Sequence, residues 1–261
     1  MVRPDIYAHR GSTVLAPENT LEAFELALSY GADVLETDVR LSRDGELVVT
    51  HDARLERTTD GNGPVREHKF AALARLDAGY RFVGPDGRAA RGTGVRLVTL
   101  SALLARFPST RVNVDLKDDD PMAAAALVRV IEGAGAERRV TVGSFHADTL
   151  ARFRALAPGI ATAAGQAEVA RLYFGRLSGS AGRRSLPYRW LQIPPSWFGI
   201  PLATRAFIEH ARSRGVGAVY WTINEPTRMR ELVARGASGV VTDRPDLAAA
   251  QWPADRQSGG A

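Results

Sequence analysis

Short runs of apolar residues recur along the chain, and each has the length and alternation expected of a β-strand. Eight such runs lie near residues 6, 35, 113, 142, 162, 191, 219 and 240. Most are followed by a stretch in which apolar residues recur at helical spacing. Because strands and helices alternate regularly in this number, the pattern predicts an α/β fold. It favours a (β/α)8 barrel over the alternative of a doubly wound sheet.

The helical stretches carry start and stop signals. The first is expected to begin at Asn19, which we expect to act as its cap, and to stop at Gly31. Further helices are expected near residues 100–107, 121–133, 147–156, 168–174, 204–214 and 227–235.

Two segments depart from the strand-helix alternation. Residues 41–50 have the pattern of a hairpin that extends the second strand, with its turn at Asp44-Gly45. Residues 53–96 contain several turn clusters and one expected helix near 70–76, which predicts a small insertion on the rim after strand two. We therefore expect one domain over residues 1–252, a mobile loop at 178–189 and a disordered tail at 253–261.

The composition fits one soluble domain. The chain has 261 residues, 45% of them hydrophobic, and no cysteine, which excludes disulfides and thiolate metal sites. Its first residues form no apolar leader segment, and no apolar run reaches the ~18 residues of a membrane-spanning helix. We expect a cytoplasmic protein without a transmembrane segment.

The net charge of +5 suits an anionic ligand. Basic residues are spread along the chain, and neither zinc-finger spacing nor an RNA-binding aromatic motif is present, so we expect no nucleic-acid partner. Lys69 and Lys117 are the only lysines in an arginine-rich chain. A lysine at 117 indicates a position where a compact point charge is wanted.

The second strand carries two acids on one face. Side chains alternate along a strand, so Glu36 and Asp38 point the same way. Two neighbouring carboxylates in an apolar strand repel each other and lose hydration, so they need a compensating cation or a solvated strand end. A divalent metal ion is the cation we expect.

Other strand ends place charged residues at the same mouth of the barrel, where barrel active sites lie. Asp115 and Lys117 end the third strand, His9 and Arg10 end the first, and the hairpin delivers His51. Oxygen ligands favour Mg²⁺ or Ca²⁺. The two histidines suit a general acid and a general base, because imidazole titrates near neutrality; which is which stays open.

Seven motifs in order resemble those of the glycerophosphodiester phosphodiesterase family, from about residue 5 to residue 247. They are His9-Arg10-Gly11, Pro17-Glu18-Asn19-Thr20, Glu36-Thr37-Asp38-Val39, His51-Asp52 with Arg57-Thr58-Thr59 and Gly61, Asn113-Val114-Asp115-Leu116-Lys117, Trp221-Thr222-Ile223-Asn224 and Thr242-Asp243-Arg244-Pro245. The resemblance implies a TIM-barrel enzyme that cleaves glycerophosphodiesters, as small-molecule substrates, to glycerol 3-phosphate and an alcohol. It also implies one divalent metal ion, Mg²⁺ or Ca²⁺, with Mn²⁺ as a further candidate.

The resemblance also implies roles for single residues. The acid/base pair falls on His9 and His51, the metal carboxylates on Glu36, Asp38 and Asp115, and the phosphate-binding cations on Arg10 and Lys117. Asp115 stands where the family usually has Glu, and the shorter side chain puts the metal position and the metal preference in question.

Neighbouring residues carry further expectations. We expect Glu18 and Asn19 to support the site and Trp221 to line the substrate wall, although the first two also fit a plain helix start and Trp221 also fits barrel core. Trp197 and Phe198 follow the sixth strand and are expected at the mouth, where an apolar leaving group could rest. That placement favours a lipid-like or bulky alcohol.

Other functions fit the same residues. One is a lysophospholipase D, another a phospholipase C-like lyase that releases a cyclic phosphate, and a third a non-catalytic barrel that binds phosphoesters. Product analysis separates the lyase from a hydrolase, because a lyase leaves a cyclic product and a hydrolase an acyclic monoester, and binding without turnover identifies the third. The sequence leaves the oligomeric state and peripheral contact with lipid open.

Overall fold

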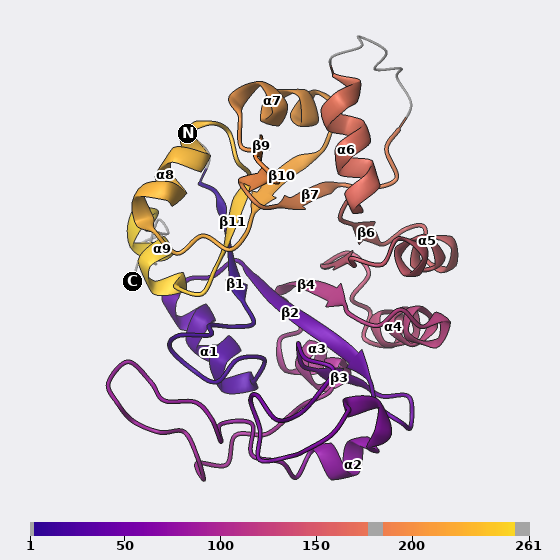
Figure 1. Ribbon diagram of the computed structural model, residues 1–261, viewed down its shortest axis with the longest axis vertical. Coiled ribbons are helices and arrows are strands. Elements are labelled where there is room, and N and C mark those ends of the chain that lie inside the picture. The colour runs from indigo at the N-terminus through magenta and orange to yellow at the C-terminus, as the bar shows by residue number, and fades with distance from the viewer. Residues whose placement is uncertain (1–2, 177–184, 254–261) are drawn as a thin grey trace, which may run out of the picture.

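The computed structural model describes residues 3–176 and 185–253, so most of the expected loop at 178–189 and nearly all of the expected tail lie outside the described residues. Parallel strands form one sheet in the order β6-β5-β4-β2-β1-β11-β10-β7, and a bridge between Ala163 and Trp190 joins its two ends. The predicted barrel is thereby confirmed (Figure 1). The strands are β1 (Asp5–His9), β2 (Val34–Leu41), β4 (Arg111–Leu116), β5 (Val140–Gly143), β6 (Ala161–Thr162), β7 (Trp190–Ile193), β10 (Gly217–Tyr220) and β11 (Gly239–Thr242).

Helices follow the strands and surround the barrel in Figure 1. They are α1 (Leu21–Tyr30), α3 (Leu100–Arg106), α4 (Pro121–Gly133), α5 (Ala147–Leu156), α6 (Gln166–Gly175), α7 (Arg205–Ser213), α8 (Pro226–Ala234) and α9 (Pro245–Gln251). Proline at the first turn starts α4, α8 and α9, where its missing N–H leaves no bond unmade. No helix among the described residues has both the length and the apolar character needed to span a bilayer.

The N-terminus of α1 corrects one expectation. The cap is Thr20, whose side chain accepts a hydrogen bond from the backbone N–H of Ala23, and not Asn19. Asn19 has a φ of +58°, which turns the chain just before the helix and sends its side chain toward β2. The stop at Gly31 is confirmed, with φ of +97° and hydrogen bonds to the last carbonyls of the helix.

The hairpin after β2 is also confirmed, because β3 (Leu47–Val49) pairs antiparallel with β2. The chain from residue 50 to 99 then forms the long loops at the bottom of Figure 1, with a 3-10 turn (Val65–Glu67) and α2 (Phe70–Leu73). This segment has an apolar cluster of its own, which includes Leu55 and Leu73. That cluster holds the loops against the barrel; the boundaries of the insertion stay a prediction.

Strand register determines which side chains meet at the carboxyl ends of the strands. His9 of β1 is paired with Glu36 of β2, and Glu36 with Asn113 of β4. One pleat further along, Asp38 is paired with Asp115. Because neighbouring strands lie about 4.8 Å apart, the pairing brings these polar side chains together before any loop contributes.

Candidate active site

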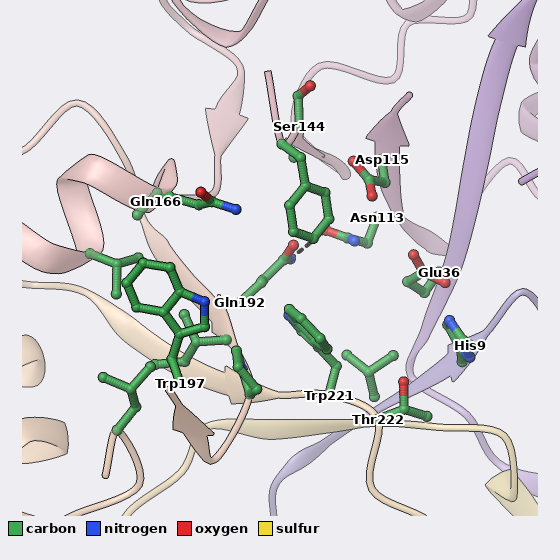
Figure 2. Close-up of a pocket in the computed structure, with 18 of the residues that line it drawn as sticks. His9, Glu36, Asn113, Asp115, Ser144, Gln166, Gln192, Trp197, Trp221 and Thr222 are labelled. Carbon is green, nitrogen blue, oxygen red and sulfur yellow. Dashed lines mark hydrogen bonds between the residues drawn. The ribbon is translucent and has the colours of Figure 1, made fainter. Parts of the chain in front are cut away.

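A cavity of about 330 Å³ opens where the parallel strands end, and its two sides differ (Figure 2). The charged wall consists of His9, Arg10, Glu36, Asp38, His51, Asp115 and Lys117, all of which the sequence analysis named. The apolar wall consists of Val169, Tyr173, Phe174, Ile193, Trp197, Ile200 and Leu202. In Figure 2, His9, Glu36 and Asp115 lie on one side of the view and Trp197 on the other.

Lys117 bridges the two aspartates of the charged wall. Its Nζ lies 2.6 Å from Asp115 Oδ2 and 2.9 Å from Asp38 Oδ1. Arg10 Nε lies 3.1 Å from Asp38 Oδ2, which also accepts a hydrogen bond from Asn19 Nδ2. Burial raises the pKa of Asp38, but the charges of Lys117 and Arg10 outweigh it and hold this pKa below its usual range. Asp38 is therefore ionised at neutral pH and held from both sides.

Glu36 has less compensation. Its buried side chain accepts a hydrogen bond at Oε2 from the backbone N–H of Arg10. Burial and the charge of Asp38 raise the pKa of Glu36. Burial also raises the pKa of Asp115, and its buried Oδ1 has no hydrogen-bond partner. Three carboxylates thus share two cations in this wall, and of the three only Asp38 has enough compensation to keep its pKa below the usual value.

The donor chemistry of the charged wall suits a hard divalent cation, because such ions prefer carboxylate oxygens and one buried oxygen of Asp115 is unbonded. As the side chains stand, no three His, Asp or Glu residues in the described part of the chain are arranged to hold a metal ion. The ammonium group of Lys117 lies between Asp38 and Asp115.

His9 is oriented by an acid at the end of β11, the strand that closes on β1. Its Nδ1 lies 2.6 Å from Asp243 Oδ1, and Asp243 Oδ2 accepts a hydrogen bond of 2.8 Å from Asn224. Burial lowers the pKa of His9, but the hydrogen bond to Asp243 and the charge of Glu36 raise it overall. Because the carboxylate keeps a proton on Nδ1, Nε2 is the atom left for a substrate.

His51 is oriented through a different network. Its Nδ1 lies 2.7 Å from Asp52 Oδ1, and Asp52 Oδ2 accepts a hydrogen bond from Arg57. Arg57 also donates to both oxygens of Glu18, at 2.7 and 2.8 Å, and Glu18 accepts a further hydrogen bond from Arg10. Burial raises the pKa of Asp52, but the hydrogen bonds from Arg57 and His51 lower it to about 2. Glu18 thus links the two arginines beside the charged wall.

Uncharged side chains span the space between the walls. Gln192 of β7 donates a hydrogen bond to Asn113 of β4, and Figure 2 shows this pair beside Trp221. Trp221 lines the cavity and meets Phe145 edge-on, with ring centroids 6.2 Å apart. Lys117 Nζ lies 5.6 Å from the centre of the Phe145 ring. Phe145 therefore lies where the charged part of the cavity meets its uncharged part.

The segment after β7 places the two aromatic residues that the sequence put at the mouth. It forms a small antiparallel hairpin of β8 (Ser196–Trp197) and β9 (Ile200–Pro201). Trp197 lines the cavity, whereas Phe198 is 89% exposed and is not among the described residues that line it. Trp197 therefore lies at the cavity as expected, and the place of Phe198 at its mouth stays a prediction.

Sequence reasoning assigned no role to Asp243, Asn224 or Phe174. Asp243 and Asn224 fall inside quoted motifs, and a barrel that closes puts the acid after the last strand beside the first strand. That signal could have paired Asp243 with His9. The apolar wall gave no comparable signal, because its residues come from separate elements and resemble ordinary core positions.

Comparisons with known proteins agree with this geometry. The model of the glycerophosphoryl diester phosphodiesterase family matches residues 9–247. A glycerophosphodiester phosphodiesterase of Caldanaerobacter subterraneus is 30% identical over 92% of this chain and 94% of its own, and one of Bacillus altitudinis 31% identical over 93% and 96%.

Solved structures are also similar. A glycerophosphodiester phosphodiesterase from Agrobacterium tumefaciens has a TM-score of 0.78 at 30% identity and covers 95% of this chain and 98% of its own. A phosphodiesterase from Oleispira antarctica, solved with the product sn-glycerol-3-phosphate, has a TM-score of 0.76 at 27% identity over 95% and 96% of the two chains.

Proposed function

The chain belongs to the glycerophosphoryl diester phosphodiesterase family, and we propose that it hydrolyses glycerophosphodiesters to glycerol 3-phosphate and an alcohol. The observation that carries the proposal is the charged wall, in which two histidines and two cations line one cavity with three carboxylates. The relative from Oleispira antarctica, with sn-glycerol-3-phosphate bound, supports the same product class.

In this proposal His9 and His51 move the protons. One removes a proton from the attacking water molecule, and the other gives a proton to the leaving oxygen. Imidazoles can do both near neutral pH. Both rings are held at Nδ1, by Asp243 and Asp52. Each therefore presents Nε2 in a fixed direction, which is what proton transfer over a hydrogen-bond distance requires.

The cations Arg10 and Lys117 face the phosphate. Both are held by Asp38, so their positions are set before a substrate arrives. A phosphodiester brings the negative charge that these cations offset, and fixed charges stabilise the transition state without having to reorganise.

We further propose that Glu36, Asp38 and Asp115 hold one divalent ion, Mg²⁺ or Ca²⁺, with Mn²⁺ as a third candidate. Such an ion, when bound, polarises a phosphate oxygen. The raised pKa of Glu36 and the unbonded oxygen of Asp115 support the assignment, because a cation at these acids would remove both costs.

The direct test is product release from glycerophosphocholine, glycerophosphoethanolamine and glycerophosphoglycerol, with Mg²⁺, Ca²⁺, Mn²⁺ or EDTA. We expect glycerol 3-phosphate, in a metal-dependent reaction that EDTA abolishes. A cyclic phosphate would instead identify a lyase. Turnover that ignores EDTA would contradict the metal site, and binding without turnover of any diester would identify a non-catalytic barrel.

Metal binding can be measured apart from activity. An ion that binds only the folded protein stabilises it by about 2.7 kcal/mol at 100 times its dissociation constant. We expect Mg²⁺ or Ca²⁺ to raise the melting temperature of the wild type and of Glu46→Gln, which changes an exposed acid outside the site. Glu36→Gln should lose most of this shift. An equal shift in all three proteins would place the ion elsewhere.

A further inference from the structure

The apolar wall is built to contact an aliphatic group. Ile193 and Leu202 are buried at its base, and Val169 and Ile200 complete its aliphatic surface. Of the described residues that line the cavity, every charged one belongs to the charged wall. This side of the cavity therefore gives a substrate no ion pair, and apart from polar groups such as the Gln166 amide and the Tyr173 hydroxyl it supplies mainly apolar contact.

The apolar surface continues outward onto the rim. Phe145 is 56% exposed, Phe174 54% and Trp197 42%, and all three line the cavity. A single exposed aromatic residue is ordinary in a folded protein, but these three come from the segment after β5, from α6 and from β8. Exposed apolar side chains gathered around one opening mark a binding surface.

The aliphatic part of the wall is a poor match for a small polar alcohol. Free glycerol, ethanolamine or a second glycerol unit would bury hydroxyl or ammonium groups against the aliphatic carbon of Ile193, Ile200 and Leu202, which costs free energy. A quaternary ammonium group would gain from aromatic faces but not from Ile193, Ile200 or Leu202. An alkyl or acyl chain has no polar group to bury, so it avoids this free-energy cost along the whole wall.

Resting on the phosphodiesterase activity proposed above, we propose that the substrate is a glycerophosphodiester with one aliphatic chain, and that this chain lies along the apolar wall while the phosphate lies at the charged wall. Two single-chain lipids share this chemistry: a monoacyl glycerophosphocholine, with the chain on glycerol, and a glycerophospho-N-acylethanolamine, with the chain on the alcohol. In either case water supplies a hydroxyl to phosphorus, the bond from phosphorus to the leaving alcohol oxygen breaks, and that oxygen takes a proton. The products are a monoacylglycerol 3-phosphate and choline from the first lipid, and glycerol 3-phosphate and an N-acylethanolamine from the second.

The test is the dependence of kcat/KM on chain length in two series, below the concentration at which each substrate aggregates. One series runs from glycerophosphocholine through short monoacyl glycerophosphocholines, and the other from glycerophosphoethanolamine through its N-acyl derivatives. While the chain lies in the cavity, each methylene should raise kcat/KM by up to about fourfold. The series with the steeper rise identifies where the chain is attached.

Trp197 and Phe198 provide a matched pair of variants. Trp197→Ala removes an aromatic side chain that lines the cavity, and Phe198→Ala removes the adjacent one, which does not. We expect Trp197→Ala to lower kcat/KM for chain-bearing substrates by about tenfold and for the chainless diesters much less, because most of the lost apolar contact is with the chain. Phe198→Ala should have a much smaller effect, because the Phe198 ring contacts Trp197, with centroids 5.1 Å apart, but does not line the cavity.

Several results would overturn the proposal. One is a kcat/KM that does not change with chain length in either series while the chainless diesters are hydrolysed well. Another is a substrate preference that depends only on the quaternary ammonium group. A third is an equal effect of Trp197→Ala and Phe198→Ala on kcat/KM. An effect of Phe198→Ala confined to aggregated substrate would point to adsorption on a lipid surface in place of the cavity. Failure of the phosphodiesterase assignment looks different, because no diester of any length would then be hydrolysed.

Discussion

The two walls of the cavity are held in place by different interactions. Ion pairs and hydrogen bonds between strand ends fix the charged wall, as Lys117 does between Asp38 and Asp115. The apolar wall rests on packing, and part of it stands on β8 and β9, a hairpin of two-residue strands. If catalysis and chain selection divide between the walls as proposed, they depend on different elements, and a change in either wall should have its own effect on the kinetics.

The largest expected effect is in the charged wall. His9→Ala and His51→Ala should each lower kcat by about 100-fold or more for every diester, because general acid-base catalysis typically supplies this much. Steady-state kinetics on glycerophosphocholine and one chain-bearing substrate measure it. Retention of activity in both variants would mean that the histidines do not transfer the protons.

The next largest effect should come from Asp243→Asn, which keeps the shape but removes the charge behind His9. We expect kcat to fall about 10- to 100-fold, the scale typical of losing a partner that orients a functional histidine. The pH profile gives a second readout. The hydrogen bond to Asp243 raises the pKa of His9, so the ionisation assigned to His9 should move to lower pH in the variant. An unchanged profile would leave Asp243 with a structural role only.

Asp243→Asn should also lower the stability of the folded protein. Burial raises the pKa of Asp243, but its hydrogen bonds from His9 and Asn224 lower it to about 2. A lowered folded-state pKa stabilises the protein above the unfolded pKa, and this contribution disappears as pH falls through the folded value. Urea unfolding at pH 6 should therefore show a loss of about 1–2 kcal/mol in the variant, after allowance for solvent screening, and a smaller difference near pH 3.

The smallest expected effect is a gain in stability, opposite in sign to the loss expected for Asp243→Asn. Burial raises the pKa of Glu36, so the folded state binds more protons than the unfolded state between the two pKa values, and stability falls as pH rises through that window. Without metal, Glu36→Gln should be more stable than the wild type at pH 8 by about 1 kcal/mol, with little difference at pH 4.

Glu46→Gln is the control for that prediction, because Glu46 is exposed and lies outside the site. It should unfold like the wild type at both pH values. If Glu36→Gln proved less stable than the wild type at pH 8 in EDTA, Glu36 would be compensated by a contact that the charged wall does not show.

Most of the barrel could be predicted from the sequence because its signals are local. The alternation of apolar and polar residues indicated the strands. Gly31 indicated the end of α1, because glycine readily adopts the left-handed backbone conformation found there. The cap of α1 was assigned wrongly because Asn19 and Thr20 are both good caps, and only the contact of Asn19 with Asp38 and Thr37 decides between them. That contact joins residues far apart in the sequence.

The charged wall could be predicted for the same reason that its strands could. Residues such as Glu36 and Asp38 follow from side-chain alternation, and register brings Asp115 beside them. The support for the histidines was harder to predict, because Asp243 lies 234 positions from His9. The insertion of Lys117 between two acids also depends on side-chain geometry that a sequence pattern does not carry.

The most direct test of the division between the walls is one plot, of log kcat/KM against chain length, for wild type, His51→Ala and Trp197→Ala. We expect His51→Ala to move the whole line down without changing its slope, whereas Trp197→Ala should lower the slope and affect the chainless diester least. A changed slope in His51→Ala, or a parallel shift in Trp197→Ala, would contradict this division.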